Sequence, residues 1–383
     1  MYKLNRILFA IALVLAIAIG IAAQTKPFTP VEGANLKAKI DAAVAQGRSN
    51  AAGGRFWVGY QFEVRPNVGI DFEIVDGSGT ISISGDGWSQ SSDSRYETRE
   101  LGFFQMYEAE LGRFTRAEVY NLRREHQFSG YPVYWAGRVT NEESLNYLRP
   151  LIDSNPGEVN RLSDRAAFAI ALHDDARVEP LLIEIVRKPV SESIRSRAIY
   201  WLGYTPESQT KNTFLADIVR SSNESMDIRE QALSALGMSR APATLPVLEN
   251  FYDTMTHRDL KRRALGGIAR NDNHDGAATF LIRIAQNETD MELRKSAVAS
   301  LGRVAGEKSL SALTNTLDSN SDVELQKQAV AAIGRRPKEE AVPILIRTAR
   351  NHPKVQVRKM AIQMLGRAGD ERAIGVLNEL LAK

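Results

Sequence analysis

The sequence predicts a mainly α-helical chain, an α-α superhelix preceded by a small antiparallel β-sheet module with one helix. Three observations predict this fold. A short segment recurs at intervals of 32 to 34 residues through the last two-thirds of the chain. Apolar residues within each recurrence follow the helical period. Before the repeats, residues 24–125 instead contain runs in which apolar and polar residues alternate, as in strands with one buried face.

Each recurrence ends on a small residue at a fixed position. An alanine precedes it by five residues, and four residues after that alanine comes a leucine or isoleucine on the same helical face. A methyl-sized side chain there lets neighbouring helices approach closely. Where the closing residue is glycine, we expect a left-handed helix cap, so the helices closed by Ala171 and Ala269 should end differently. The closing residues are Gly137, Ala171, Gly203, Gly237, Ala269, Gly302, Gly334 and Gly366, and the alanines are Ala166, Ala198, Ala232, Ala264, Ala297, Ala329 and Ala361.

A second amphipathic helix follows each closing residue after a short polar loop. Its buried column is predicted to be Leu148, Leu182, Leu215, Leu248, Phe280, Leu313, Leu345 and Leu377. Two such helices per repeat cannot bury their apolar faces alone, so they must stack on neighbouring pairs. Residues 126–383 are therefore predicted to form about eight helix pairs. The first pair should be an atypical cap, since Tyr131–Val139 fits only half of the motif and Pro132 takes the alanine position.

The repeat resembles HEAT repeats, in the short bacterial form also known from phycobilisome lyases. The likeness rests on an acidic residue, an apolar-Arg pair, the alanine and the closing glycine, as in Asp227-Ile228-Arg229 followed by Ala232 and Gly237. The resemblance implies a superhelix that binds proteins, and it transfers no active site. The arginine recurs as Arg195, Arg229, Arg294 and Arg358, with Gln326 in one repeat. We expect each to pair with acidic groups of a neighbouring repeat, in preference to forming a ladder for a ligand.

Residues 1–23 are predicted to be a signal peptide. Lys3 and Arg6 precede an apolar stretch from Ile7 to Ile21, and small residues follow it. The alternative is an uncleaved membrane anchor, although the stretch is shorter than the ~20 residues that a spanning helix needs. No cysteine follows, which argues against a lipid anchor. The expected location is thus periplasmic or secreted.

Residues 24–125 are predicted to form the small α+β module. Leu36, Ile40 and Ala43 mark one amphipathic helix. Strict alternation over residues 56–64 predicts a strand, and residues 70–74 and 81–83 predict a hairpin around 76–79. Two further strands are expected at 100–108 and 114–122. The module would cap the apolar end of the repeat array.

Composition argues against several kinds of chemistry. The chain has no cysteine, and its 49 basic and 46 acidic residues give a net charge of +3. Such a balance does not predict nucleic-acid or anionic-membrane binding. Phosphate loops, HExxH helices and nucleophile elbows are missing from the sequence. Of the five histidines, His173 and His274 are expected in solvated loops too far apart to share a metal. We therefore expect no enzyme activity, cofactor or metal.

Few residues stand out as candidates for binding a partner. Trp88 lies in a polar loop and is hard to explain as a core residue. Arg187, Arg220 and Arg350 occupy similar solvent-side positions on the second helix of their repeats, together with Asp253 and Asp318. Because this presumed concave face has mixed charge, a protein surface is favoured over a polyanion site.

The predicted function is a non-catalytic protein–protein interaction scaffold in the cell envelope, which holds its partner on the solenoid surface. One alternative is an envelope ligand-sensing or structural component that acts through the β module. Another, less favoured, is a cofactor-attachment factor similar to the lyases, because those proteins act in the cytoplasm. The expected partner is a protein, with no nucleic acid and no membrane unless the N-terminal segment is retained.

Overall fold

The structure is a computed structural model. It describes residues 28–50, 54–66, 68–72, 79–83, 98–110, 112–123, 126, 128–153, 160–188 and 190–381. The predicted signal peptide, most of the predicted 76–79 turn and Trp88 lie outside these ranges. The chain divides into two compact units, and the boundary between them in the sequence falls between Asp175 and Ala176. In the described part of the chain, no helix has both the length and the apolar content needed to cross a bilayer.

The first unit contains a mixed five-stranded sheet with the order β1-β7-β2-β5-β6. The strands are β1 (Phe28–Pro30), β2 (Arg55–Glu63), β5 (Glu100–Glu108), β6 (Arg113–Asn121) and β7 (Val133–Arg138). β2, β5 and β6 are antiparallel as predicted, whereas β7 runs parallel to both β1 and β2. The prediction of a purely antiparallel sheet was therefore wrong, because β7 makes the sheet mixed. β3 (Val68–Phe72) and β4 (Gly79–Ile83) form the predicted hairpin as a separate two-stranded sheet.

β7 occupies the segment that had been assigned to the first helical repeat. Gly137 lies in this strand with φ +79°, and Pro132 precedes it, so neither residue closes or enters a helix. Val133, Tyr134 and Trp135 are β-branched or aromatic, and they pair with β1 on one side and β2 on the other. The sheet thus continues past the boundary predicted at residue 125.

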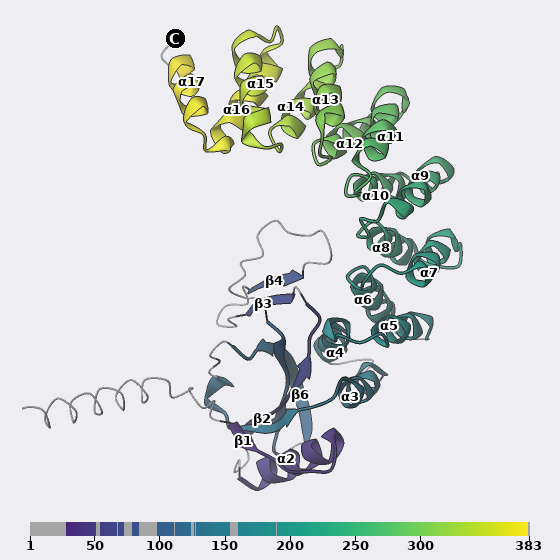
Figure 1. Cartoon of the computed structure of the whole chain (residues 1–383), viewed down its shortest axis with the longest axis vertical. Helices are drawn as coiled ribbons and strands as arrows, with labels where there is room; N and C mark the ends of the chain where they lie inside the picture. The colour runs from purple at the N-terminus through teal and green to yellow at the C-terminus, as the bar shows by residue number, and fades with distance from the viewer. Residues whose placement is uncertain are drawn as a thin grey trace, which may run out of the picture. The chain divides into compact units, whose positions relative to one another are not determined.

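Helices cover one face of this sheet. α2 (Leu36–Asn50), α3 (Asn141–Asp153) and α4 (Asn160–Leu172) pack against its strands (Figure 1). The alternating apolar residues of β2 point to this side, and Phe56, Tyr60 and Phe62 are fully buried. The opposite face is also apolar, because Trp57 and Phe104 lie in a buried cluster there. The first helix pair is therefore part of the sheet unit.

The second unit is a two-layer array of helices. One layer contains odd-numbered and the other even-numbered helices; each odd helix from α5 to α15 packs on the even helix that follows it, and α17 packs on α16 (Figure 1). The odd layer has α5 (Val178–Arg187), α7 (Gln209–Arg220), α9 (Leu245–Thr254), α11 (His274–Asn287), α13 (Glu307–Ser319), α15 (Lys338–Asn351) and α17 (Glu371–Leu381). The even layer has α6 (Glu192–Leu202), α8 (Met226–Leu236), α10 (Arg258–Ile268), α12 (Met291–Leu301), α14 (Val323–Ile333) and α16 (Val355–Ala368).

The buried columns confirm the predicted repeat. All seven alanines of the alanine column, from Ala166 to Ala361, have no exposed surface. The leucine or phenylalanine column of the second helix is buried from Leu148 to Leu345, and Leu377 in the last helix is half-buried. These positions make up the core between the two layers.

The closing glycines are needed for a different reason from the one predicted. Gly203, Gly237, Gly302 and Gly334 are right-handed, and so is Ala269, which ends α10 in the same way. What these positions require is space. A Cβ at Gly237 would lie 2.8 Å from Cα of Gly267 in the next even helix. Glycine therefore sets the close approach of successive even helices.

This close approach decides which layer is inner. The even helices pack tightly against one another, whereas successive odd helices are spread further apart. An array bends toward the layer whose members are closer, and Figure 1 shows the even helices on the inside of the curve. The prediction had treated the odd helices as the concave layer, which was wrong.

Candidate functional site

Of the predicted contact residues, Trp88 lies outside the described ranges, and the three arginines lie on the outer layer, where they join successive odd helices. The guanidinium of Arg187 lies 5.2 Å from the ring centre of Phe214, and that of Arg220 lies 5.1 Å from the ring of Phe251. Arg350 forms a 2.5 Å ion pair with Glu379. The structure does not bring these three arginines together. Each of their contacts links one repeat to the next.

The recurring arginine of the motif caps a helix end. The Nε atoms of Arg229 and Arg294 donate to the carbonyls of Val219 and Ala285, at the end of the preceding odd helix, over 2.9 and 3.1 Å. The side-chain amide of Gln326 makes the same bond at 2.8 Å to Leu317, which explains why glutamine is accepted there.

Pairing with a neighbouring repeat, the predicted role, is seen at Arg195. Its guanidinium contacts Glu224 at 2.5 Å, in addition to bonding the carbonyl of Val186. The cap satisfies carbonyls that the end of a helix leaves without a partner.

A serine–histidine pair lies in the first unit. His173 Nε2 is 2.8 Å from Oγ of Ser144, and Ser144 Oγ in turn donates to the Tyr60 hydroxyl at 3.1 Å. The imidazole stacks on Phe62 at 4.2 Å. His173 is 2% exposed and Ser144 is fully buried, so the predicted solvated loop histidine is a core residue. Without access for a substrate, this pair joins helices to the sheet.

Among the described residues, one group has the spacing of metal ligands. Glu230, His257 and Asp259 place one donor atom each within 4.8 Å of one another. Both carboxylates already have cationic partners, since Arg263 contacts Glu230 at 2.7 Å and Arg262 contacts Asp259 at 2.6 Å. The charge available to a cation is therefore offset locally.

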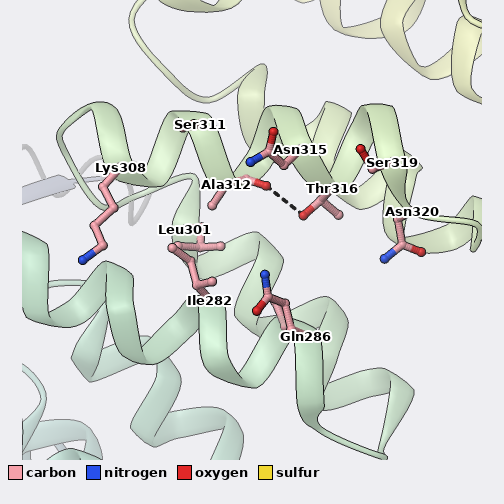
Figure 2. A pocket seen from close by; sticks show the side chains of 11 residues that line it. Ile282, Gln286, Leu301, Lys308, Ser311, Ala312, Asn315, Thr316, Ser319 and Asn320 are labelled. Carbon is pink, nitrogen blue, oxygen red and sulfur yellow. Dashed lines mark hydrogen bonds between the residues drawn. The ribbon is translucent and has the colours of Figure 1, made fainter.

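Open cavities lie between outer helices. The one between α11 and α13 measures about 480 Å³ and is shown in Figure 2. Gln286, Asn315 and Asn320 give it uncharged polar groups, and Thr316 donates to the carbonyl of Ala312 at 2.9 Å. A second cavity of about 940 Å³ lies between α5 and α7. Its lining includes the carboxylates of Glu179, Glu184 and Asp217 and the cations of Arg187 and Lys188.

The inner face of the even layer has three columns of side chains. Residues four apart lie on the same side of a helix, so Lys295, Ala299 and Arg303 share one side of the α12 segment. The same positions recur in the neighbouring even helices. The lysine column is Arg262, Lys295, Lys327 and Lys359, the small column is Ser234, Gly266, Ala299 and Ala331, and the arginine column is Arg270, Arg303, Arg335 and Arg367.

Carboxylates of the same helices neutralise most of the lysine column. Arg262 contacts Asp259, Lys295 contacts Glu292 at 2.9 Å, and Lys327 contacts Glu324 at 2.9 Å. The bond to Glu292, helped by the charge of Glu324 in the next repeat, raises the pKa of Lys295.

The arginine column has no such partners. Within the described parts of the chain, none of its four members forms an ion pair; Arg270 donates to the carbonyl of Gly237 at 3.5 Å and Arg303 to the hydroxyl of Ser300 at 3.0 Å. Partial desolvation by neighbouring groups and the positive charges of Arg270 and Arg335 lower the pKa of Arg303, although its side chain still reaches solvent. Arg303, Arg335 and Arg367 are exposed, while Arg270 is half-buried. The column is therefore a row of positive charge that faces solvent.

Sequence reasoning missed this column although its signal is simple. Each of these arginines directly follows a closing residue, at positions 269, 302, 334 and 366. In the two preceding repeats Tyr204 and Met238 take this place. The arginine position lies one residue beyond the closing position that ends the recurring segment, and it belongs to the even helices, whereas the predicted charged face belongs to the odd helices.

Comparison with known proteins supports the repeat assignment. Residues 178–269 and 310–383 match the family model for HEAT repeats. No curated protein matches the chain significantly.

Similar solved structures include human deoxyhypusine hydroxylase (16% identity, 62% of this chain and 90% of that chain, TM-score 0.31). Others are the CpcE–CpcF complex of phycocyanin lyase from Nostoc sp. (16%, 63% and 93%, 0.33) and Escherichia coli YibA (14%, 69% and 94%, 0.37). The family match and the two-layer array together identify the fold as a HEAT-repeat solenoid with a small mixed-sheet module at its N-terminal side.

Proposed function

We propose that this chain is a non-catalytic scaffold of the cell envelope that holds a protein partner on the inner face of its HEAT-repeat unit. The observation that carries the proposal is the inner face itself. In the α10, α12 and α14 repeats it presents the same three kinds of side chain in register, which suits a long contact better than a small-molecule site. The outer layer is less suited, because its arginines are engaged in contacts between repeats.

The envelope location rests on the sequence of residues 1–23, with Lys3 and Arg6 before the apolar stretch. N-terminal sequencing of the chain recovered from periplasm and membrane tests this part. A mature chain that begins after residue 23 is the expected result. Recovery of the chain from the cytoplasm alone, with Met1 retained, would contradict it.

A photo-reactive residue placed on each layer tests the scaffold. We expect a cross-linker at Ala299, in the small column of α12, to capture a discrete protein in intact cells. A matched cross-linker at the exposed Asn315 of α13, on the outer layer, should capture much less. Equal capture at both positions, or none at Ala299, would argue against an inner-face scaffold.

A further inference from the structure

We infer that the arginine column, Arg270, Arg303, Arg335 and Arg367, binds an extended acidic segment of a protein partner, with about one carboxylate to each arginine. This inference rests on the proposed scaffold function and names the chemical class of the partner.

In the described part of the second unit these arginines contact no carboxylate, and the bonds of Arg270 to Gly237 and of Arg303 to Ser300 leave their positive charge without an anionic partner. Most other arginines of the second unit are engaged in ion pairs, namely Arg195, Arg220, Arg240, Arg258, Arg262, Arg263, Arg283, Arg336, Arg347, Arg350 and Arg372. A cation at the C-terminal end of a helix interacts well with the helix dipole. That benefit does not require guanidinium groups near enough to depress one another's pKa, as Arg270 and Arg335 do to Arg303.

Aligned guanidinium groups are suited to carboxylates. Each presents several donors in a planar fork that matches the two oxygens of a carboxylate. Binding an anion here would replace the repulsion between like charges with attraction. The arginine column is therefore suited to bind carboxylates from a partner, whereas the lysine column already has carboxylates of its own.

The spacing indicates an extended chain. Closely packed helices lie 8–10 Å apart, and an extended peptide rises about 3.3 Å per residue. An acidic residue at every third position thus keeps in step with the arginines. Beside the column, the small residues leave room for a backbone, and a Cβ added at Gly266 would meet no atom within 4 Å. Met238 and Tyr204, which continue the column, offer apolar contact to one end of the segment.

A nucleic acid fits the same face less well. Phosphates in nucleic acids are dense, with one charge per 3.4 Å of a strand in B-form DNA. The lysine column beside the arginine column is already paired with Glu292 and Glu324, so it offers little further positive charge for so dense a row of phosphates. A peptide with one acidic group per repeat can satisfy the arginines and keep its other residues neutral.

Fluorescence anisotropy on the full purified chain tests the inference. The probe is a labelled peptide of roughly twelve residues with glutamate at every third position, long enough to span the column at the strand rise given above. Controls are a peptide of the same composition with the glutamates clustered, an all-glutamine version and a single-stranded oligonucleotide. We expect the spaced acidic peptide to bind best, with affinity that falls as salt is added.

A matched pair of double variants locates the site. Arg303→Gln/Arg335→Gln and Lys295→Gln/Lys327→Gln remove the same charge from the α12 and α14 repeats. We expect the arginine variant to weaken peptide binding by about tenfold or more and the lysine variant by about twofold or less. Circular dichroism checks that both variants keep the fold of the parent chain. Equal losses in the two variants, or tighter binding of the oligonucleotide than of the peptide, would overturn the inference.

Failure here is separable from failure of the scaffold proposal. If Ala299 captures a partner in cells while the acidic peptide does not bind, the scaffold stands and the acidic class is wrong. If the peptide binds through the arginines but Ala299 captures nothing, the column binds acidic segments and the scaffold role is wrong.

Discussion

Adjacent glycines in α10 should respond oppositely to substitution by alanine. Alanine is favoured over glycine inside a helix by about 0.8–1.0 kcal/mol. At Gly266 a new methyl group would meet no neighbouring atom within 4 Å. Gly266→Ala should therefore raise the free energy of unfolding by about 1 kcal/mol.

At Gly267 the same change meets the end of the preceding even helix, α8. Its Cβ would lie 2.8 Å from Cα of Gly237 and 3.1 Å from Cδ1 of Leu248. Separating two packed backbones typically costs about 1–3 kcal/mol, which exceeds or cancels the helix gain. Gly267→Ala should thus have a free energy of unfolding about 0–2 kcal/mol lower than the parent. It should be less stable than Gly266→Ala in every case.

Urea denaturation followed by circular dichroism measures both variants. Since repeat arrays can unfold locally, hydrogen exchange of the amides in α8 and α10 should accompany it. Gly237→Ala provides a reciprocal control, because it puts a methyl group into the same contact from the other side, and combining it with Gly267→Ala should give a non-additive loss. If Gly267→Ala proved as stable as Gly266→Ala, the even helices would not be held at their spacing by glycine.

Three further predictions follow from other contacts. Arg229→Met removes the bond to the carbonyl of Val219 and should lower the free energy of unfolding in urea by about 1 kcal/mol. Arg229→Gln should be tolerated, because Gln326 makes the same bond in α14. Equal losses of stability in the two variants would refute the capping role. Ser144→Ala removes the hydroxyl between Tyr60 and His173 and should lower the free energy of unfolding of the first unit by about 1–3 kcal/mol. The loss of near-ultraviolet circular dichroism in urea measures this unfolding. An unchanged urea midpoint would contradict the prediction. The bond from Tyr252, 2.6 Å long, holds the pKa of Glu288 below its usual value. A depressed carboxyl pKa stabilises the fold above the unfolded-state pKa, and this contribution disappears as pH falls through the folded-state pKa. Tyr252→Phe should therefore make the free energy of unfolding in urea less dependent on pH below about pH 5. The same pH dependence in the variant and the parent would count against this prediction.

Local pattern determined much of the helical part. The alanine column and the leucine column were readable because residues three and four apart share a face of a helix whatever surrounds it. Their burial, complete in the alanine column and lacking only at Leu377 in the leucine column, follows from that periodicity. Alternation likewise located β2, β5 and β6, whose side-chain period is two.

Segments whose conformation depends on distant partners were misread. Tyr131–Val139 matched half of a repeat, yet Val133–Arg138 is a strand, because β1 and β2 offer it pairing on both sides. The segment Phe28–Pro30 is too short for its sequence pattern to predict a strand. His173 looked like a loop residue, and its burial comes from Phe62 and Ser144, which lie far away in the sequence.

The sequence by itself determined the period of the array, the two helices of each repeat and the residues that fill the core between them. Only the tertiary structure decided which helix layer is inner, since curvature depends on how closely Gly237 and Gly267 bring neighbouring backbones together. That choice in turn set the function of the charges. Arg187 and Arg220 became contacts between outer helices, and Arg303 and Arg335 came to lie in one row, because only stacking brings residues one repeat apart into electrostatic contact.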